Sequence, residues 1–241
     1  MKYLFFVLLA LSVNISNAQS VDEVIDKYTL AMGGLESINK IKTARITGNL
    51  VSQGSSYLIT IHILNGKSML TEVTVNGQTV INAYDKGKGW KKNPFENIHT
   101  PTEVKTADDL ALLKLQTNLA NNLMDYKKRG HQVVLAGQED IDSIKTYKII
   151  LTSKDDGKKN IYYIGTTDYM LVRSDSKQKI QGKEYDAQTY YSDTKDINGL
   201  KFSAHFVRKI DGIVFQEVTY DKIELDIPLD EKLFSIPGSV K

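Results

Sequence analysis

Apolar and polar residues alternate with a period of two along most of the chain, which is typical of strands that bury one face. The apolar positions of the first two clear runs are Tyr57, Ile59, Ile61, Ile63, Met69, Val73 and Val75. Similar runs follow at 131–136, 145–152, 159–164, 169–173, 184–191, 201–209 and 213–225. Together with about four strands before residue 106, this pattern predicts a mainly β protein of about eleven strands.

Turn signals separate the strand-like runs. Asn-Gly or Asp-Gly pairs occur at 65–66, 76–77, 156–157, 198–199 and 211–212. Such pairs suit two-residue hairpins, in which both central residues take a positive φ. We therefore expect consecutive antiparallel hairpins rather than βαβ units. No Ser/Gly-rich or charged tract divides the chain, so residues 19–241 are expected to form a single domain.

Helices are predicted at two places where the apolar spacing changes to three or four residues. The first follows Ser20, a suitable N-cap, and stops at Gly33-Gly34, with a further short helical turn over 35–41. The second is predicted over 107–129, directly after the N-cap Thr106. Its main apolar stripe consists of Leu112, Leu115, Leu119, Leu123 and Tyr126. This stripe can cover the concave side of a sheet, or it can be the buried face of an ordinary core helix.

Residues 1–18 have the pattern of a secretory signal peptide. Lys2 precedes a continuously apolar run over 3–13, and Ser16-Asn17-Ala18 offers small residues to a signal peptidase. The run is too short to span a hydrocarbon core of about 30 Å, which argues against the alternative of an N-terminal membrane anchor. Because the chain has no cysteine to lipidate, the cleaved product is expected to be exported, soluble and unanchored. In a bacterium with two membranes, it would lie in the periplasm.

Composition and charge narrow the classes of partner. The chain has 31 Lys+Arg against 29 Asp+Glu, a formal net charge of +2. This balance gives no reason to expect nucleic acid or an anionic membrane as the main partner. The absence of cysteine excludes disulfides, thiolate metal sites and cysteine nucleophiles. We expect a monomer.

No set of residues with the spacing of a catalytic or metal site is found. The histidines, at 62, 99, 131 and 205, are far apart, and none pairs with another ligand at metal-binding spacing. No Gly-x-Ser-x-Gly motif precedes a helix, and 87–89 lacks the third glycine of a dinucleotide-binding loop. The sequence therefore predicts no catalytic residue, no metal and no cofactor, and a protein that is not an enzyme.

Several segments resemble a known family. Residues 84–95 (YDKGKGWKKNPF) resemble the D-G-x-x-x-W-x-Y-N-P-F stretch of LolA-type periplasmic carriers of outer-membrane lipoproteins. The second predicted helix lies where that family has its central helix, and 233–238 (LFSIPG) is similar to its closing F-x-x-P strand. Other segments resemble a large branch of exported LolA-like proteins. These segments are 28–34, 162–164 with 169–173, and 191–193 with 198–200.

The resemblance implies a half-open antiparallel β-barrel of about eleven strands, with two or three helices covering its concave face. It implies a carrier that binds lipoprotein acyl chains in a hydrophobic cavity and delivers them toward the outer membrane, without catalysis. The implied partners are the acylated lipoproteins, an inner-membrane releasing complex and an outer-membrane acceptor. Where the family has a functional arginine, this chain offers Lys67, whose ammonium lacks the planar fork of a guanidinium.

The residues expected to line such a cavity come from the alternating runs and from the second predicted helix. They are Tyr57, Ile59, Ile61, Ile63, Met69, Val73, Trp90, Leu112, Leu115, Leu119, Leu123 and Tyr126. Each of them could instead pack in an ordinary core. Two other functions stay open: a module that binds another hydrophobic small molecule, such as a free lipid or glycolipid, and an envelope assembly or scaffold protein. A barrel without a cavity of several hundred Å³ would favour the scaffold.

Overall fold

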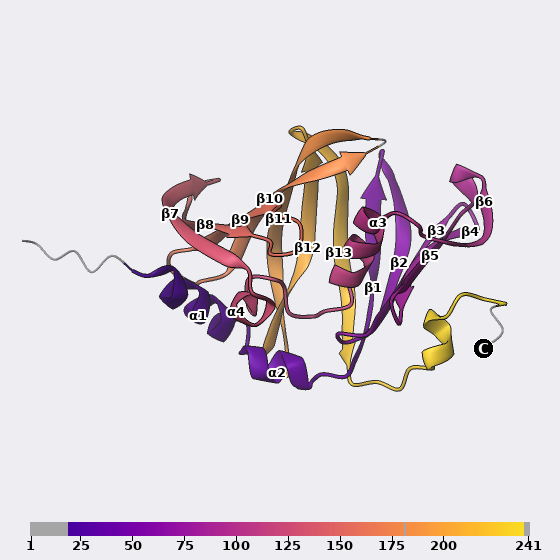
Figure 1. The fold of residues 1–241 in the computed structure, drawn as a ribbon, viewed down its shortest axis with the longest axis horizontal. Coiled ribbons are helices and arrows are strands. Elements are labelled where there is room, and N and C mark those ends of the chain that lie inside the picture. The colour runs from indigo at the N-terminus through magenta and orange to yellow at the C-terminus, as the bar shows by residue number, and fades with distance from the viewer. Residues whose placement is uncertain (1–18, 181, 239–241) are drawn as a thin grey trace, which may run out of the picture.

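The structure is a computed structural model that describes residues 19–180 and 182–238 (Figure 1). The predicted signal peptide over 1–18 lies outside the described residues. The strands are β1 (Thr43–Ser52), β2 (Ser55–Leu64), β3 (Ser68–Val75), β4 (Gln78–Asp85), β5 (Lys88–Asn93), β6 (Ile98–Glu103), β7 (Gln132–Ile141), β8 (Ile144–Thr152), β9 (Lys159–Gly165), β10 (Leu171–Ile180), β11 (Lys183–Ile197), β12 (Leu200–Ile210) and β13 (Ile213–Leu225). All of them belong to one antiparallel sheet.

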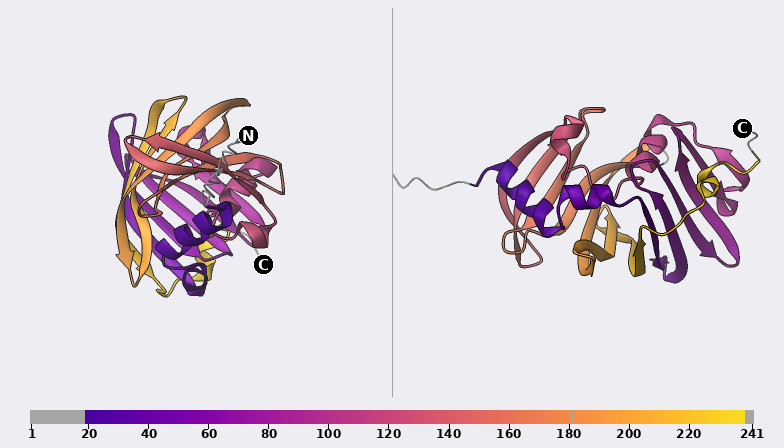
Figure 2. Two further views of the ribbon diagram at one scale, coloured as in Figure 1. Left: turned by 90° about the vertical axis from the view of Figure 1, so that its left-hand side faces the viewer. Right: turned by 90° about the horizontal axis from the view of Figure 1, so that it is seen from below.

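The order of the strands makes the sheet a half-open barrel. From β1 to β6 and from β7 to β13 each strand pairs with the next one in sequence, and the first and last strands, β1 and β13, pair with each other in the middle of the sheet. The two edges are β6 and β7, which do not pair. Figure 2 shows the strands curving around the N-terminal helix. The predicted architecture is therefore confirmed, with thirteen strands in place of about eleven.

The two additional strands lie before the second predicted helix. β5 and β6 have the sequences KGWKKN and IHTPTE, in which no regular alternation of apolar residues is visible. They are strands because β4 pairs with β5 and β5 with β6, and hydrogen bonding to a neighbour can override a weak local preference. The predicted antiparallel hairpins are present. In three of the five predicted turns both central residues have a positive φ, at 76–77, 198–199 and 211–212.

The pairing that joins β1 to β13 depends on a glycine. The register shifts between Thr47 and Gly48, where the two strands form a bulge. A Cβ on residue 48 would lie 2.0 Å from the carbonyl oxygen of Thr219, so a side chain at this position cannot be accommodated without moving backbone. Because bulges bend and twist a sheet, this one contributes to the curvature of the barrel.

The N-terminal helices agree with the sequence prediction. They are α1 (Val21–Ala31) and α2 (Leu35–Lys40), and the Ser20 hydroxyl accepts a hydrogen bond from the Glu23 amide at 3.1 Å. One side of α1 is buried against the concave face of the sheet, where Val24, Ile25 and Tyr28 share a hydrophobic cluster with residues of β8 and β9. Among the described helices, none is long and apolar enough to cross a membrane.

The second helix was predicted as one element over 107–129, and this prediction is wrong in its middle. The structure has α3 (Ala107–Leu115) and the short α4 (Tyr126–Arg129), joined by an irregular segment over 116–125. Thr106 caps α3 as predicted, accepting a hydrogen bond from the Asp109 amide at 3.2 Å. The helix does not continue because asparagine side chains take the place of helical carbonyls. Asn65 Oδ1 accepts from the Leu119 amide, and Asn121 Oδ1 accepts from the amides of Leu123 and Met124.

Two single-turn 3-10 helices complete the fold, η1 (Pro94–Glu96) and η2 (Glu231–Phe234). The C-terminal segment that carries η2 packs on the convex face of the sheet. Phe234 is fully buried there in a cluster with Leu70, Ala83 and Trp90. We call the concave face, which contacts α1, α3 and the 116–125 segment, the inner face, and the opposite side the outer face.

Candidate ligand-binding site

The structure places six of the predicted site residues together on the inner face. The register of β2 and β3 sets Ile59 opposite Val73, Ile61 opposite Thr71 and Ile63 opposite Met69. The six residues are Tyr57, Ile59, Ile61, Ile63, Met69 and Val73. Ile63 belongs to a cluster with Ala44, and Met69 is fully buried against α3. Alternation alone is enough to find this face, because strand residues two apart point to the same side.

The break between α3 and α4 separates the other predicted residues. Leu112 and Leu115 lie on α3 and are 51% and 44% exposed. Leu119 lies in the irregular segment and packs against two of the core clusters. Leu123 and Tyr126 are buried with α1, so the predicted stripe is not one continuous surface.

Trp90 does not lie on the inner face. It pairs with Ala83, whereas Gly89 pairs with Tyr84, so Trp90 and Tyr84 point to opposite sides. The Trp90 indole donates a hydrogen bond to the Phe234 carbonyl at 2.8 Å. Its place is in the outer cluster with Phe234, and it therefore cannot line a cavity on the inner face.

A cavity of about 430 Å³ lies between α3 and the inner face. We call it the inner cavity. Its lining residues are Thr71, Asn82, Lys91, Val104, Asp109, Leu112, Leu113, Gln116, Gln178 and Gln216. Only Leu112 among them was predicted. The lining residues that lie on strands are all polar, so a search for apolar alternation does not select them.

Helix α3 packs two of its leucines against the sheet and leaves two others exposed, one of them at the inner cavity. Leu110 and Leu113 pack over Met69 and Tyr84 of the inner face. The helix can lie close to the sheet because residue 89 is glycine: a Cβ there would lie 2.8 Å from the Leu113 Cδ1 methyl. The exposed leucines, Leu112 and Leu115, have no apolar cluster of their own among the described residues.

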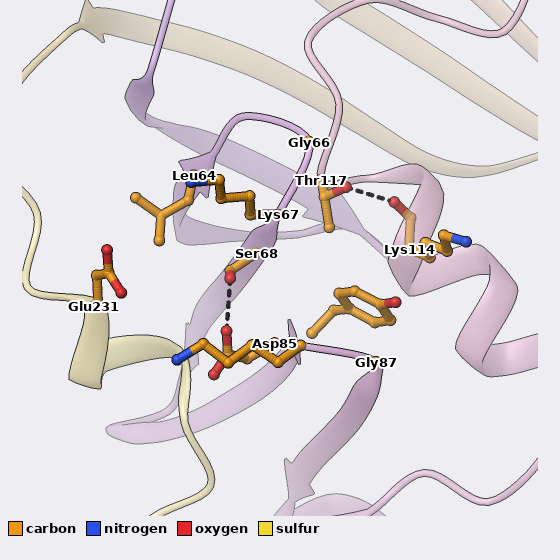
Figure 3. A pocket seen from close by; sticks show the side chains of 11 residues that line it. Leu64, Gly66, Lys67, Ser68, Asp85, Gly87, Lys114, Thr117 and Glu231 are labelled. Carbon is orange, nitrogen blue, oxygen red and sulfur yellow. Dashed lines mark hydrogen bonds between the residues drawn. The ribbon is translucent and has the colours of Figure 1, made fainter.

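A second cavity, of about 360 Å³, lies where the β2–β3 and β4–β5 turns meet the end of α3 (Figure 3). Five of its lining residues are charged: Lys67, Asp85, Lys86, Lys114 and Glu231. Ser68 donates a hydrogen bond to Asp85 at 2.7 Å across it. Lys67, which stands where the resemblance implies an arginine, thus lies in this second cavity and not in the inner one.

An aromatic cluster and an arginine occupy the inner face of β11–β13. The ring of Phe206 lies edge-on to Tyr191 and Tyr220, at centroid distances of 5.5 and 5.0 Å. Burial raises the pKa of Tyr220 to about 12 and also raises that of Tyr191, so both phenols are neutral near pH 7. Arg208 is the next inner residue of β12, and burial lowers its pKa.

The sequence contains a signal for Arg208 that was missed. Along β12 the inner positions alternate with outer ones. They are Leu200, Phe202, Ala204, Phe206 and Arg208. An arginine in phase with four apolar residues is predicted to point inward, which is uncommon for a charged side chain and typical of a functional position.

Three strands bring together a serine, a histidine and a glutamate on the outer face. Ser192 Oγ lies 2.7 Å from His205 Nδ1, and His205 Nε2 lies 2.8 Å from Glu217 Oε1. Nucleophilic catalysis also needs a substrate cleft and donors for the oxyanion. These three residues line neither cavity, and Ser192 is exposed. In the described part of the chain, no three His, Asp or Glu residues are grouped as a metal site would require.

Comparisons with known proteins give likenesses in structure only. No family model and no curated protein matches the sequence. The structure is similar to that of a LolA superfamily protein from Nitrosomonas europaea, at 12% identity and a TM-score of 0.60, over 90% of this chain and 97% of the other. It is also similar to a DUF1329 family protein from Desulfovibrio piger, at 14% identity and a TM-score of 0.61, over 90% and 98% of the two chains.

A third similar structure is a domain assigned to outer-membrane lipoprotein sorting, from Vibrio parahaemolyticus. It has 10% identity and a TM-score of 0.60, over 89% of this chain and 95% of that one. At such low identities a likeness establishes the fold and leaves function to be argued from the site. Because the matches span about nine tenths of the chain, the half-open barrel described above is the fold that these three structures share.

Proposed function

We propose that the protein is a periplasmic carrier that binds the acyl chains of lipoproteins on its inner face and delivers them toward the outer membrane. The observation that carries this proposal is the placement of α3. This short helix packs on the fully buried Met69 through Leu113, while Leu112 lies half-exposed at the inner cavity and Leu115 is also exposed. These two leucines are apolar side chains that no described neighbour covers, so this part of α3 lacks a partner.

In the proposed carrier, the acyl chains of the bound lipoprotein are the partner that covers the exposed leucines of α3. Acyl chains enter between α3 and the sheet, and α3 moves outward so that its leucines and the inner face enclose them. In the empty protein, α3 partly fills the space. The helix is suited to such movement because it has nine residues and is joined to the core through an irregular segment on its C-terminal side.

The volume of the cavities favours binding over a purely structural role. Ligand cavities in proteins measure about 300–1,000 Å³. The two cavities here measure about 430 and 360 Å³. A scaffold barrel filled by its own side chains would lack such space, which is why a binding protein is the better interpretation.

The energetics of an acyl chain in water supply the reason for a carrier. Exposing a chain of about 15 methylenes costs on the order of 12 kcal/mol, at about 0.8 kcal/mol for each methylene. A lipoprotein therefore needs a shield to cross an aqueous compartment. The resemblance to lipoprotein carriers, the structurally similar sorting domain and the predicted signal peptide all support this cargo and compartment.

Leu112→Asp should weaken binding of a synthetic lipopeptide with three palmitoyl chains by about tenfold or more, because the bound state would bury the new charge. Native mass spectrometry of the mixture, with the same peptide lacking acyl chains as a ligand control, measures the effect. Leu30→Asp is the matched control, since Leu30 is an exposed leucine on α1, away from the cavity. A wild-type protein that binds neither peptide, or equal losses in the two variants, would contradict the proposal.

A further inference from the structure

Arg208 is a half-buried cation without a counter-ion among the described residues, and its Nε atom is fully buried. The other arginines of the chain each pair with a carboxylate: Arg45 with Glu224, Arg129 with Asp125 and Arg173 with Asp175. Over 19–180 and 182–238, no ion pair involves Arg208. Its Nη2 donates to the neutral side-chain oxygen of Gln178 at 2.5 Å, and its buried Nε has no hydrogen-bond partner. Burying a charge without a counter-ion, with one donor unpaired, is costly.

Arg173 shows how the Nε–Nη2 edge of a guanidinium is hydrogen-bonded when both nitrogens have partners. Its Nε and Nη2 donate to the two carboxylate oxygens of Asp175, at 2.8 and 2.9 Å. In Arg208 only Nη2 donates, to the amide oxygen of Gln178, and Nε has no partner. This edge is shaped for two parallel hydrogen bonds to a carboxylate, which a lysine could not provide.

Arg208 itself does not line the inner cavity, but two neighbouring glutamines separate it from that cavity. Gln178, which accepts the hydrogen bond from Arg208, lines that cavity. So does Gln216, the residue of β13 that lies opposite Arg208 in the strand register. The aromatic neighbour on β11, Tyr191, is uncharged near pH 7 because burial raises its pKa. A ligand in the cavity therefore reaches the guanidinium by displacing a single neutral amide.

We propose that Arg208 binds the carboxylate of a long-chain fatty acid whose hydrocarbon chain lies in the inner cavity beneath α3. The inference rests on the proposed function, since both place an acyl chain in the same cavity. It goes further by adding a second ligand class, because an acyl chain attached to a lipoprotein is an ester or amide without a free carboxylate, and by naming the residue that binds the charged head. The volume of about 430 Å³ has room for a single chain, and the apolar residues of the lining that would contact it are Val104, Leu112 and Leu113.

Calorimetric titrations at pH 8 with tetradecanoate and with tetradecan-1-ol test the inference, because the two ligands differ only in the head. The wild-type protein should bind tetradecanoate about tenfold more tightly or better, the usual range for hydrogen bonds to charged groups. Arg208→Gln should remove this preference by weakening the binding of tetradecanoate. Lys209→Gln, which removes a charge from the opposite face one residue away, should keep the preference.

The outcomes separate the inference from the proposed function. Equal affinities for the two ligands in the wild-type protein, or a preference that survives Arg208→Gln, would overturn the role of Arg208 while leaving acyl binding intact. Failure of the wild-type protein to bind either ligand would overturn the inference, whereas the lipopeptide measurement described above decides the proposed function separately.

A second variant keeps the test independent of any folding defect in Arg208→Gln. Gln178→Glu is nearly isosteric and supplies the missing carboxylate from the protein itself. We expect its melting temperature to rise and its preference for tetradecanoate to disappear, since the edge is then occupied. A lower melting temperature together with a retained preference would overturn the proposal.

Discussion

A disulfide between cysteines introduced at Gly89 and Leu113 should abolish binding of the tripalmitoylated lipopeptide, and reduction should restore it. A Cβ at residue 89 would lie 2.8 Å from the Leu113 Cδ1 methyl, which is two bonds from the Leu113 Cβ. The two Cβ atoms are therefore near enough for a disulfide without a large movement of α3. The chain has no native cysteine, so the introduced pair has no competing partner. The bond holds α3 on the sheet, where it occupies the space that the chains need.

The control for this experiment is a disulfide of similar kind that leaves α3 free. Thr74 and Thr79 are register partners on β3 and β4, next to the turn that joins these strands. The corresponding Cys pair should bind the lipopeptide equally well when oxidised and when reduced. If the Gly89–Leu113 pair also binds equally in both states, α3 does not need to move, and the gating role assigned to it is wrong.

Phe234→Ala should lower the free energy of unfolding by about 3–5 kcal/mol, the usual cost of deleting a buried phenylalanine. Phe234 is fully buried, although it lies near the end of the chain and outside the sheet. It fills the outer cluster between Leu70, Ala83 and Trp90, and its carbonyl accepts the hydrogen bond from the indole of Trp90. Urea unfolding followed by tryptophan fluorescence measures the change, because Trp90 is the only tryptophan and lies in the cluster.

Phe95→Ala provides the matched comparison. Phe95 is 53% exposed in η1, so its removal should change the free energy of unfolding by about 0.5 kcal/mol or less. Lipopeptide binding at temperatures where Phe234→Ala remains folded should be close to that of the wild-type protein, because the outer cluster is on the other side of the sheet. Equal losses of stability in the two variants would contradict the packing described for the C-terminal segment.

The sheet could be predicted because its signals are local. Alternation identifies Ile59, Ile61 and Ile63 as one face of a strand, and pairs such as Asn76-Gly77 mark the turns. The same signals fail for β5, whose lysines and asparagine hide a strand that depends on its pairing with β4. The single helix predicted over 107–129 failed for a related reason. Its interruption depends on Asn65, more than fifty residues away, which accepts a hydrogen bond from the Leu119 amide.

The binding site was predicted less completely than the fold. The sequence analysis found the apolar side of the inner face and placed Trp90 there, because it could not tell the two faces of β5 apart. It missed Gln178 and Gln216, since the partner of each is set by strand register and not by spacing along the chain. Arg208 is a residue that alternation could have identified, because it interrupts an apolar series at a position that points inward.

Photochemical labelling tests most directly the central claim, that acyl chains bind on the inner face beneath α3. The lipopeptide would carry a diazirine in one palmitoyl chain, and peptide mapping after irradiation would locate the adducts. The account predicts adducts in peptides of β3, β4 and α3, with Met69, Tyr84 and Leu113 as the expected sites. Adducts concentrated instead on the outer cluster around Trp90 and Phe234, or spread evenly over the sheet, would contradict it.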